Sequence, residues 1–225
     1  MKVELKSITP SIEETIVEIA RVSSSRTDKK EDPSGLLNYL IKNSHWSPFE
    51  HGFITFEIET SKAIGIQLLR HRSFTFQEFS QRYQNVGKVS EEGIFEEIEI
   101  RRQATNNRQS SEEVFDPKIT MNDYFGGYIP GFETEASNLV EGYLESTKEF
   151  YHKLLEVGVA REQARMILPM ATKTRIYMTG SVRSWIHFLS LRDDGHAQKE
   201  AQEIAKEIKK IFKIELPVIS KALGF

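Results

Sequence analysis

The chain has 225 residues, of which 39% are hydrophobic, and it carries a formal net charge of −3 at pH 7. This length and hydrophobic content predict a single folded domain, 1–225, and exclude a wholly disordered chain. The small negative charge disfavours general coating of nucleic acid, and the absence of cysteine excludes disulfides, thiolate metal sites and thiol nucleophiles.

The sequence contains no signal for export or membrane insertion. No apolar run approaches the ~20 residues that span a bilayer, and the beginning, MKVELKSITPS, lacks the apolar stretch of a signal peptide. We therefore expect a cytoplasmic protein that binds no membrane. No G-x-G-x-x-G or Walker-type loop is present, which argues against a Rossmann domain and against an NTPase.

Two amphipathic helices are predicted near the N-terminus. The first would begin at a capping box formed by Ser11 and Glu14 and bury one apolar face, Ile12, Ile16, Ile19 and Ala20. After a polar loop, 23–30, Asp32 is a suitable cap and Pro33 a suitable first residue for a second helix. Its apolar face would contain Leu36, Leu37, Leu40 and Ile41.

The segment NSHWSPFEHGF interrupts the helical pattern, because Pro48 and its polar neighbours favour a loop. Loops on a rigid scaffold often carry functional residues, so this one is a candidate site, with an ordinary polar loop as an equal alternative. A metal site at His45 and His51 lacks a third ligand nearby. Farther on, apolar and polar residues alternate over 53–60, which predicts a strand with one buried face.

The stretch RHRSFTFQEFSQRY, from Arg70 to Tyr83, contains three arginines. A helix from Lys62 is expected to run into it, with Gln67 on the same face as Arg70. Guanidinium groups do not lose their protons, and Glu78 is the only acid in the stretch. The arginines therefore indicate a bound anion, such as a phosphate or a carboxylate.

Other interpretations of this stretch remain open. Four interleaved aromatic rings favour partial burial over a solvated basic face. A single-stranded nucleic-acid binding module would stack Phe74, Phe76 and Phe79 on bases, although the net charge opposes it. A metal hydrolase built on the six histidines lacks any known ligand spacing.

The middle of the chain, about 84–130, is rich in charged residues, Asn and Gly, and we expect a loop-rich excursion that forms a lid or a subunit contact. Within it, FEEIEIRRQ favours a short strand.

Beyond this excursion, Arg161 and Arg165 lie one helical turn apart, before Pro169. Between these segments a long helix is predicted over 133–157, with a core-forming stripe of Leu139, Val140, Tyr143, Leu144, Thr147, Phe150, Tyr151, Leu154 and Leu155.

The C-terminal part of the chain is predicted to contain one strand and two helices. Residues 173–179 alternate as in a strand, and the helix SVRSWIHFLSLR places Arg183 and His187 on one face. The segment LRDDGHAQ follows with Arg192 and His196. The last helix carries lysines outside and, inside, Ala201, Ile204, Ala205, Ile208, Ile211 and Phe212.

Three segments resemble the flavin-dependent thymidylate synthase family. The most specific is Arg-His-Arg at 70–72, followed after seven residues by Ser-x-Arg at 80–82. More than 100 residues later, Arg192 and His196 match the family pattern Leu-Arg-x-x-x-His-Ala-Gln, and HWSPFEH is similar to a family segment that contacts the flavin. Many members have Ser, Asn and Asn where this chain has Thr75, Gln77 and Ser181.

The resemblance implies a mixed α/β fold, with a small mixed sheet and long helices, and a homotetramer whose sites combine residues from several chains. It also implies synthesis of dTMP from dUMP, with methylenetetrahydrofolate as carbon donor and FAD, reduced by NADPH, as hydride carrier. Because the chain has no cysteine, methylation would proceed without the covalent adduct of the classical enzyme.

The same resemblance assigns the site residues. The FAD set is Ser23, His45, Ser47, Glu50, Arg70, His71, Arg72, Glu78, Ser181, Arg183, His187 and His196. The dUMP set is Gln67, Arg70, Glu78, Ser80, Gln81, Arg82, Arg165 and Arg192, and no metal ion is expected. Arg192 is the expected catalytic residue, since its fixed charge at the uracil edge would stabilise negative charge on the ring. Ser80 is expected to hold phosphate rather than to act as a nucleophile, because its neighbours offer no base.

Overall fold

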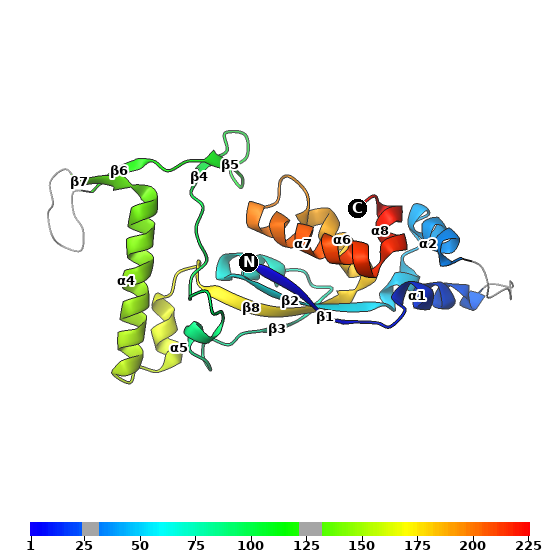
Figure 1. The fold of residues 1–225 in the computed structure, drawn as a ribbon, viewed down its shortest axis with the longest axis horizontal. Coiled ribbons are helices and arrows are strands. Elements are labelled where there is room, and N and C mark those ends of the chain that lie inside the picture. The colour runs from blue at the N-terminus through cyan, green and yellow to red at the C-terminus, as the bar shows by residue number, and fades with distance from the viewer. Residues whose placement is uncertain (24–31, 122–131) are drawn as a thin grey trace. The chain divides into compact units, whose positions relative to one another are not determined.

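The computed structural model describes residues 1–23, 32–121 and 132–225. The chain forms two compact units, drawn as a ribbon in Figure 1. The first unit contains Met1–Thr60, Ile64–Glu78 and Arg175–Phe225, and the second contains Ser61–Ala63 and Phe79–Thr174. Most of the predicted loop 23–30 and the end of the predicted excursion lie outside the described residues. No helix in the described ranges is long and apolar enough to cross a membrane.

A four-stranded sheet forms the base of the first unit. Its strand order is β1-β2-β8-β3, with bounds β1 (Lys2–Ile8), β2 (Phe53–Ser61), β8 (Lys173–Ser181) and β3 (Thr75–Glu78). β1 pairs antiparallel with β2, and β3 pairs antiparallel with β8 from Thr75↔Thr179 to Glu78↔Ile176. The predicted strands at 53–60 and 173–179 are confirmed as β2 and β8, whereas β1 was not predicted from the sequence.

Helices complete the first unit, which gives the mixed α/β architecture that the resemblance implies. Figure 1 shows α6, α7 and α8 on one face of the sheet. The bounds are α1 (Ile12–Ala20), α2 (Pro33–Lys42), α3 (Lys62–Leu68), α6 (Val182–Arg192), α7 (Lys199–Glu215) and α8 (Pro217–Leu223), with short 3-10 turns η1 (Arg21–Ser23) and η2 (Ser47–Glu50). Ser23, assigned above to FAD, is the last residue of η1.

The core of this unit lies between that face of the sheet and the helices. The apolar side of β2 is fully buried, as alternation predicts: Ile54, Phe56 and Ile58. Opposite them, α6 and α7 contribute Trp185, Phe188, Ile204, Ile208 and Phe212 to the same cluster. Each helix thus buries the apolar stripe that its 3.6-residue period places on one side.

Gly180 allows one ring of the central stretch to approach β8 closely. A Cβ atom at this position would lie 2.4 Å from Cδ1 and Cε1 of Phe74. The Phe74 ring is buried and meets the Trp185 ring edge-on, with centroids 4.6 Å apart. This packing holds the turn that carries the Arg-His-Arg triplet against the core.

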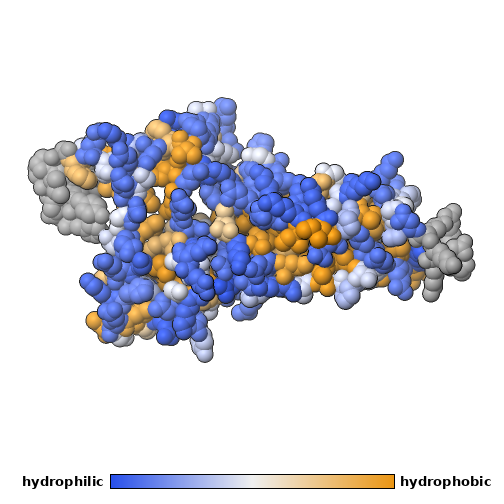
Figure 2. Space-filling model, in the orientation of Figure 1, coloured by the Kyte–Doolittle hydropathy of each residue, from blue (hydrophilic) through white to orange (hydrophobic). Residues whose placement is uncertain are grey.

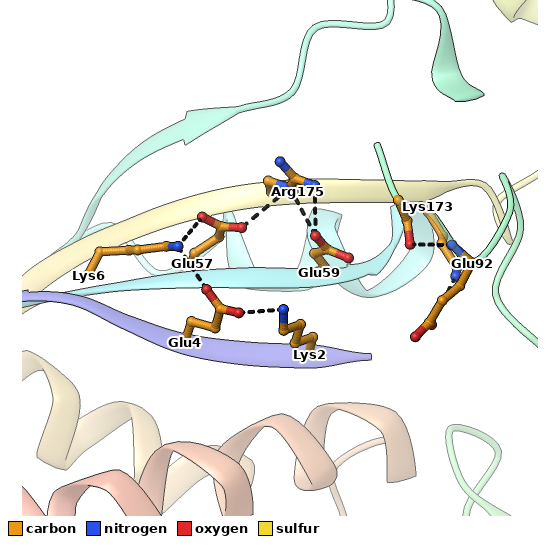
Figure 3. Close-up of polar contacts among 9 residues, drawn as sticks. Lys2, Glu4, Lys6, Glu57, Glu59, Glu92, Lys173 and Arg175 are labelled. Atoms are coloured by element: carbon orange, nitrogen blue, oxygen red, sulfur yellow. Dashed lines mark hydrogen bonds and ion pairs between the residues drawn. The ribbon is translucent and has the colours of Figure 1, made fainter. Parts of the chain in front are cut away.

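The other face of the sheet carries a chain of ion pairs, shown in Figure 3. Lys6 on β1 bridges two carboxylates, with Nζ 2.8 Å from Glu4 and 2.9 Å from Glu57. Arg175 on β8 lies 3.4 Å from Glu57 and 2.8 Å from Glu59. Burial by itself raises the pKa of the Glu57 carboxyl, but hydrogen bonds from Lys6 and Tyr177 and the charges of Lys6 and Arg175 outweigh it, so this pKa lies below its usual value.

The second unit has a small core and little sheet. Its elements are η3 (Val86–Lys88), β4 (Arg101–Gln103), β5 (Ser111–Val114), β6 (Lys118–Met121), β7 (Phe132–Glu135), α4 (Ala136–Glu156), α5 (Arg161–Ala164) and η4 (Arg165–Ile167). β4 pairs with β5 and β6 pairs with β7, both antiparallel. The buried cluster consists of Val86, Ile94, Tyr151 and Ala164.

The prediction that the whole stripe of the long helix is core is wrong. On α4, Thr147 and Tyr151 are buried, but Tyr143 is 48% exposed and Phe150 is 55% exposed. The buried cluster of this unit has too few residues to cover a 21-residue helix. Hydrophobic surface is accordingly visible over the α4 and α5 region in Figure 2.

Three local predictions are also corrected by the structure. Ser11 adopts a left-handed conformation with φ of 45° and makes no side-chain cap for α1, because the chain turns sharply there from β1. Asp32, by contrast, accepts a hydrogen bond from Ser34 N and caps α2 as predicted. α3 ends at Leu68, so the triplet at 70–72 lies in a turn rather than in a helix. Of FEEIEIRRQ, 101–103 alone forms a strand.

We expect Gly180→Ala to lower the free energy of unfolding by about 1–3 kcal/mol, because the added methyl group must displace the Phe74 ring from a packed core. The matched control is Gly35→Ala on α2, where no atom beyond the adjoining residues and the backbone of the same helix lies within 4 Å of the added carbon. There the better helix propensity of alanine should leave stability equal or raise it by up to ~1 kcal/mol. Urea unfolding of both variants is the measurement, and equal stability of Gly180→Ala and wild type would contradict the tight contact.

We expect Glu57→Gln to lower the free energy of unfolding at pH 7 by roughly 1–2 kcal/mol, after discounting for the partly exposed partners. Because folding lowers the pKa of Glu57, its contribution is present above the unfolded pKa of about 4.3 and is lost as pH falls through the folded value. The difference from wild type should therefore shrink at acid pH. Urea unfolding at pH 7 and at a pH below 4 tests this, with the exposed Glu18→Gln on α1 as control. A difference in unfolding free energy between Glu57→Gln and wild type that is the same at both pH values would refute it.

Candidate active site

A pocket of about 680 Å³ opens in the first unit. Its volume is in the range of small-molecule and cofactor sites. Apolar walls come from Trp46, Ile186 and Leu223. The remaining lining is polar: Glu50, Ser73, Arg183, Ser184, His187 and Ser190. Such a mixture suits a ligand that combines flat aromatic rings with hydrogen-bonding groups.

The predicted residues Glu50, Ser181 and Arg183 meet at one wall of this pocket. Ser181 Oγ donates to Glu50 Oε2 at 2.6 Å, and Arg183 Nη1 donates to Glu50 Oε1 at 2.8 Å. Ser181 is also the N-cap of α6 and accepts from Ser184 N at 3.2 Å. The start of α6 therefore fixes the Glu50 carboxylate from two sides, while the half-exposed Arg183 keeps other N–H groups available to a ligand.

Arg192, at the other end of α6, is held by the segment that contains the triplet. Its Nε donates to His71 Nε2 at 3.0 Å, and its Nη2 donates to the Gln67 carbonyl at 3.3 Å. A longer contact of 3.5 Å joins Nη1 to Gln67 Oε1. These bonds leave part of the guanidinium fork for a ligand, since arginine has five N–H donors.

The imidazole of His71 is neutral at physiological pH. Burial, followed by the charges of Arg192 and His187, lowers its pKa to about 4. Its ring packs edge-on against Phe188, with centroids 4.9 Å apart. Because Nε2 accepts from Arg192, the single proton of the neutral ring is on Nδ1.

Most of the other predicted FAD residues of the first unit lie at the surface. His45, Ser47, Arg70, Arg72 and His196 are exposed, and Glu78 ends β3 half-buried. His187 lines the pocket one turn after Arg183, as their spacing predicts. His196 lies in a turn after α6, where Nδ1 is 2.8 Å from Asp194 Oδ1.

The predicted phosphate residues belong to the second unit. Ser80 is exposed in a turn in which its carbonyl accepts from Tyr83 N and Gln84 N. Arg82 makes a loose, exposed ion pair of 3.4 Å with Glu162 of α5. Arg161 Nη1 donates to the Tyr83 carbonyl at 3.1 Å, so α5 is fastened to this turn.

Two of these residues carry buried donors with no partner among the described residues, namely Gln81 Nε2 and Arg165 Nε. A buried N–H group without an acceptor is costly, and an incoming anion would satisfy it. The observation fits the assignment of Arg165 to the dUMP phosphate and of Gln81 to the dUMP set. Within the described ranges, no group of three His, Asp or Glu residues is placed to hold a metal ion.

Several pocket residues were missed by the sequence interpretation. Trp46 lies within HWSPFEH, Ser73 directly follows the triplet, and Ser184 follows Ser181 by three positions. Their closeness to recognised motifs is a signal that could have identified them. Ser190 and Leu223 offer no such signal, because their place in the pocket depends on how α6 and α8 pack.

Comparisons with known proteins agree with the motifs. The family described as "Thymidylate synthase complementing protein" matches residues 4–218. A probable flavin-dependent thymidylate synthase of Paramecium bursaria Chlorella virus 1 is 42% identical over 214 residues, which cover 95% of this chain and 91% of that protein. The flavin-dependent thymidylate synthase of Synechocystis sp. is 42% identical over 215 residues, with 95% and 90% covered.

A solved structure extends the likeness to the fold. The UMP/dUMP methylase PolB from Streptomyces cacaoi, crystallised with 5-Br dUMP, superposes with a TM-score of 0.74 at 28% identity, covering 99% of this chain and 94% of that one. The family match spans both compact units and all three segments that resemble the family. The chain therefore belongs to the flavin-dependent thymidylate synthase family.

Proposed function

We propose that this protein converts dUMP to dTMP, with methylenetetrahydrofolate as carbon donor and NADPH as reductant. The observation that carries the proposal is the family match over residues 4–218, which includes the anion-binding stretch and the segment of Arg192. FAD, when bound, supplies the hydride that reduces the transferred methylene group to methyl. The structural neighbour PolB is named for the same substrate class.

The pocket of the first unit is the proposed FAD site. Glu50, Arg183 and His187 line it, and the buried Ser181 orients Glu50. The mixed apolar and hydroxyl lining supports a flat, polar-edged ligand. Family resemblance adds the remaining residues to this site: Ser23, His45, Ser47, Arg70, His71, Arg72, Glu78 and His196.

The dUMP phosphate is proposed to bind at the Ser-x-Arg turn and η4. The loose ion pair of Arg82 and the unpartnered Nε of Arg165 support this role, with Ser80 and Gln81 as further donors. Gln67, Arg70 and Glu78 are proposed to position the rest of the nucleotide.

Arg192 is proposed to act on the uracil ring. Its guanidinium stays charged and is held by His71 and Gln67, so it can face developing negative charge without reorganising. Stabilising an anionic ring raises the nucleophilicity of the carbon that receives the methylene group. A cysteine adduct is not available to this chain, which contains no cysteine.

We further propose that the chain works as one domain, 1–225, in a cytoplasmic homotetramer with shared sites. The family match across both units supports a single functional domain. The exposed Tyr143, Phe150 and Val157 of the α4 region, seven residues apart, support contact with other copies.

The purified protein should be yellow or become yellow with FAD, and dUMP should perturb the flavin spectrum. With NADPH and methylenetetrahydrofolate it should form dTMP, detected by chromatography, and UMP should be assayed in parallel as an alternative substrate.

Light scattering should give the mass of four chains. A preparation that stays colourless in excess FAD would overturn the proposal, and if it also shifts a labelled oligonucleotide, the nucleic-acid binding interpretation is favoured.

Ser80→Ala should weaken dUMP binding by ~1.5–3 kcal/mol, as expected for a hydrogen bond to a charged group, while turnover stays measurable at saturating dUMP. Arg192→Ala should instead abolish most methylation although NADPH still reduces FAD, because its contact strengthens as charge develops on the ring. Ser7→Ala and Arg108→Ala, both exposed, are the controls. Loss of all turnover in Ser80→Ala with an active Arg192→Ala would reverse both assignments.

A further inference from the structure

Gln198 is not among the predicted site residues, yet it contacts one of them. Gln67 Nε2 donates to Gln198 Oε1 at 2.6 Å, across 131 positions of sequence. The same Gln67 side chain turns its Oε1 toward Arg192 Nη1, at 3.5 Å, and the main-chain carbonyl of Gln67 accepts from Nη2 at 3.3 Å. Gln198, Gln67 and Arg192 therefore form a continuous line of polar contacts.

The direction of these contacts has a chemical consequence. A carboxamide donates at one end and accepts at the other, and a guanidinium only donates, so Gln67 presents its oxygen to Arg192 and its NH2 group to the acceptor at Gln198. In the flipped orientation, the NH2 group of Gln67 would face the guanidinium, and its oxygen would face Gln198 Oε1. The contact with the guanidinium would then be repulsive, the contact with Gln198 would persist only if that carboxamide rotated as well, and the guanidinium would lose one of its fixed partners.

The place of Gln198 in the fold supports a specific role. Gln198 is the N-cap of α7, where its carbonyl accepts from Ala201 N and Gln202 N. Its side chain makes no cap hydrogen bond, and Ser, Thr, Asp and Asn are the residues that stabilise this position. The side chain contacts Gln67 instead, so it does not cap its own helix.

We propose that Gln198 is a positioning residue that holds the Gln67 carboxamide with its oxygen toward Arg192 and thereby orients the guanidinium toward the uracil ring. The inference rests on the proposed function of Arg192. Gln198 itself touches neither the substrate nor the cofactor in this role. Its loss should therefore affect the methylation step more than nucleotide affinity, since the phosphate ligands are unchanged.

The test compares Gln198→Met, which keeps the side-chain length but removes the acceptor, with Gln198→Glu, which keeps an acceptor oxygen. Gln202→Met is the matched control, because this amide lies on the same helix and donates to the Ala197 carbonyl. Each variant is measured for maximal methylation rate, for dUMP affinity by calorimetry of the FAD-loaded protein, and for melting temperature.

Gln198→Met should lower the maximal rate about tenfold, with dUMP affinity within about threefold of wild type and the melting temperature unchanged. Gln198→Glu should recover most of that rate, and Gln202→Met should match wild type. An active wild type with an equally active Gln198→Met, or a Gln198→Glu as slow as Gln198→Met, would overturn the inference alone. A wild-type protein that binds no FAD and makes no dTMP would overturn the proposed function, and this inference with it.

Discussion

The hydrogen bond from Arg192 to His71 depends on an imidazole that is neutral. A protonated His71 would present an N–H group to the guanidinium and add a second positive charge beside it. Burial against Phe188 and Phe74, followed by the charges of Arg192 and His187, lowers the pKa of His71 to about 4 and keeps the ring neutral. The Phe74 ring reaches its place because position 180 has no side chain. Core packing therefore contributes most to the neutral state of His71, on which the geometry of Arg192 depends.

The helix α6 joins the two parts of the site in the first unit. Its N-cap Ser181 and its first turn fix Glu50 at the pocket wall, and its last residue is Arg192. Arg183 and Arg192 are nine residues apart, about 13 Å along the axis and on roughly opposite sides of the helix at ~100° per residue. One rigid element can thus hold one arginine at the pocket and the other at His71, with the apolar side chains between them in the core.

Long-range contacts of this kind also account for what the local patterns missed. Glu13 is of a residue type that is rarely buried, but it lies on the apolar face of α1, and its carboxylate accepts from Ile219 N at 2.7 Å. It therefore satisfies the start of α8, a helix that was not predicted and whose Leu223 lines the pocket. On α4 the sequence analysis predicted burial for side chains that are exposed. Periodicity shows that one face of a helix is apolar, but it does not show whether the same chain covers that face.

The sequence by itself determined the chemistry available and most of the regular elements. The triplet, the Ser-x-Arg motif and the absence of cysteine are properties of the chain, and the periods of β2, β8, α6 and α7 are local signals. Only the tertiary structure decided that His71 is neutral, that Glu50 is held by Ser181 and Arg183, and that Gln198 meets Gln67. These properties arise from desolvation and from hydrogen bonds between residues more than 100 positions apart, which no local pattern encodes.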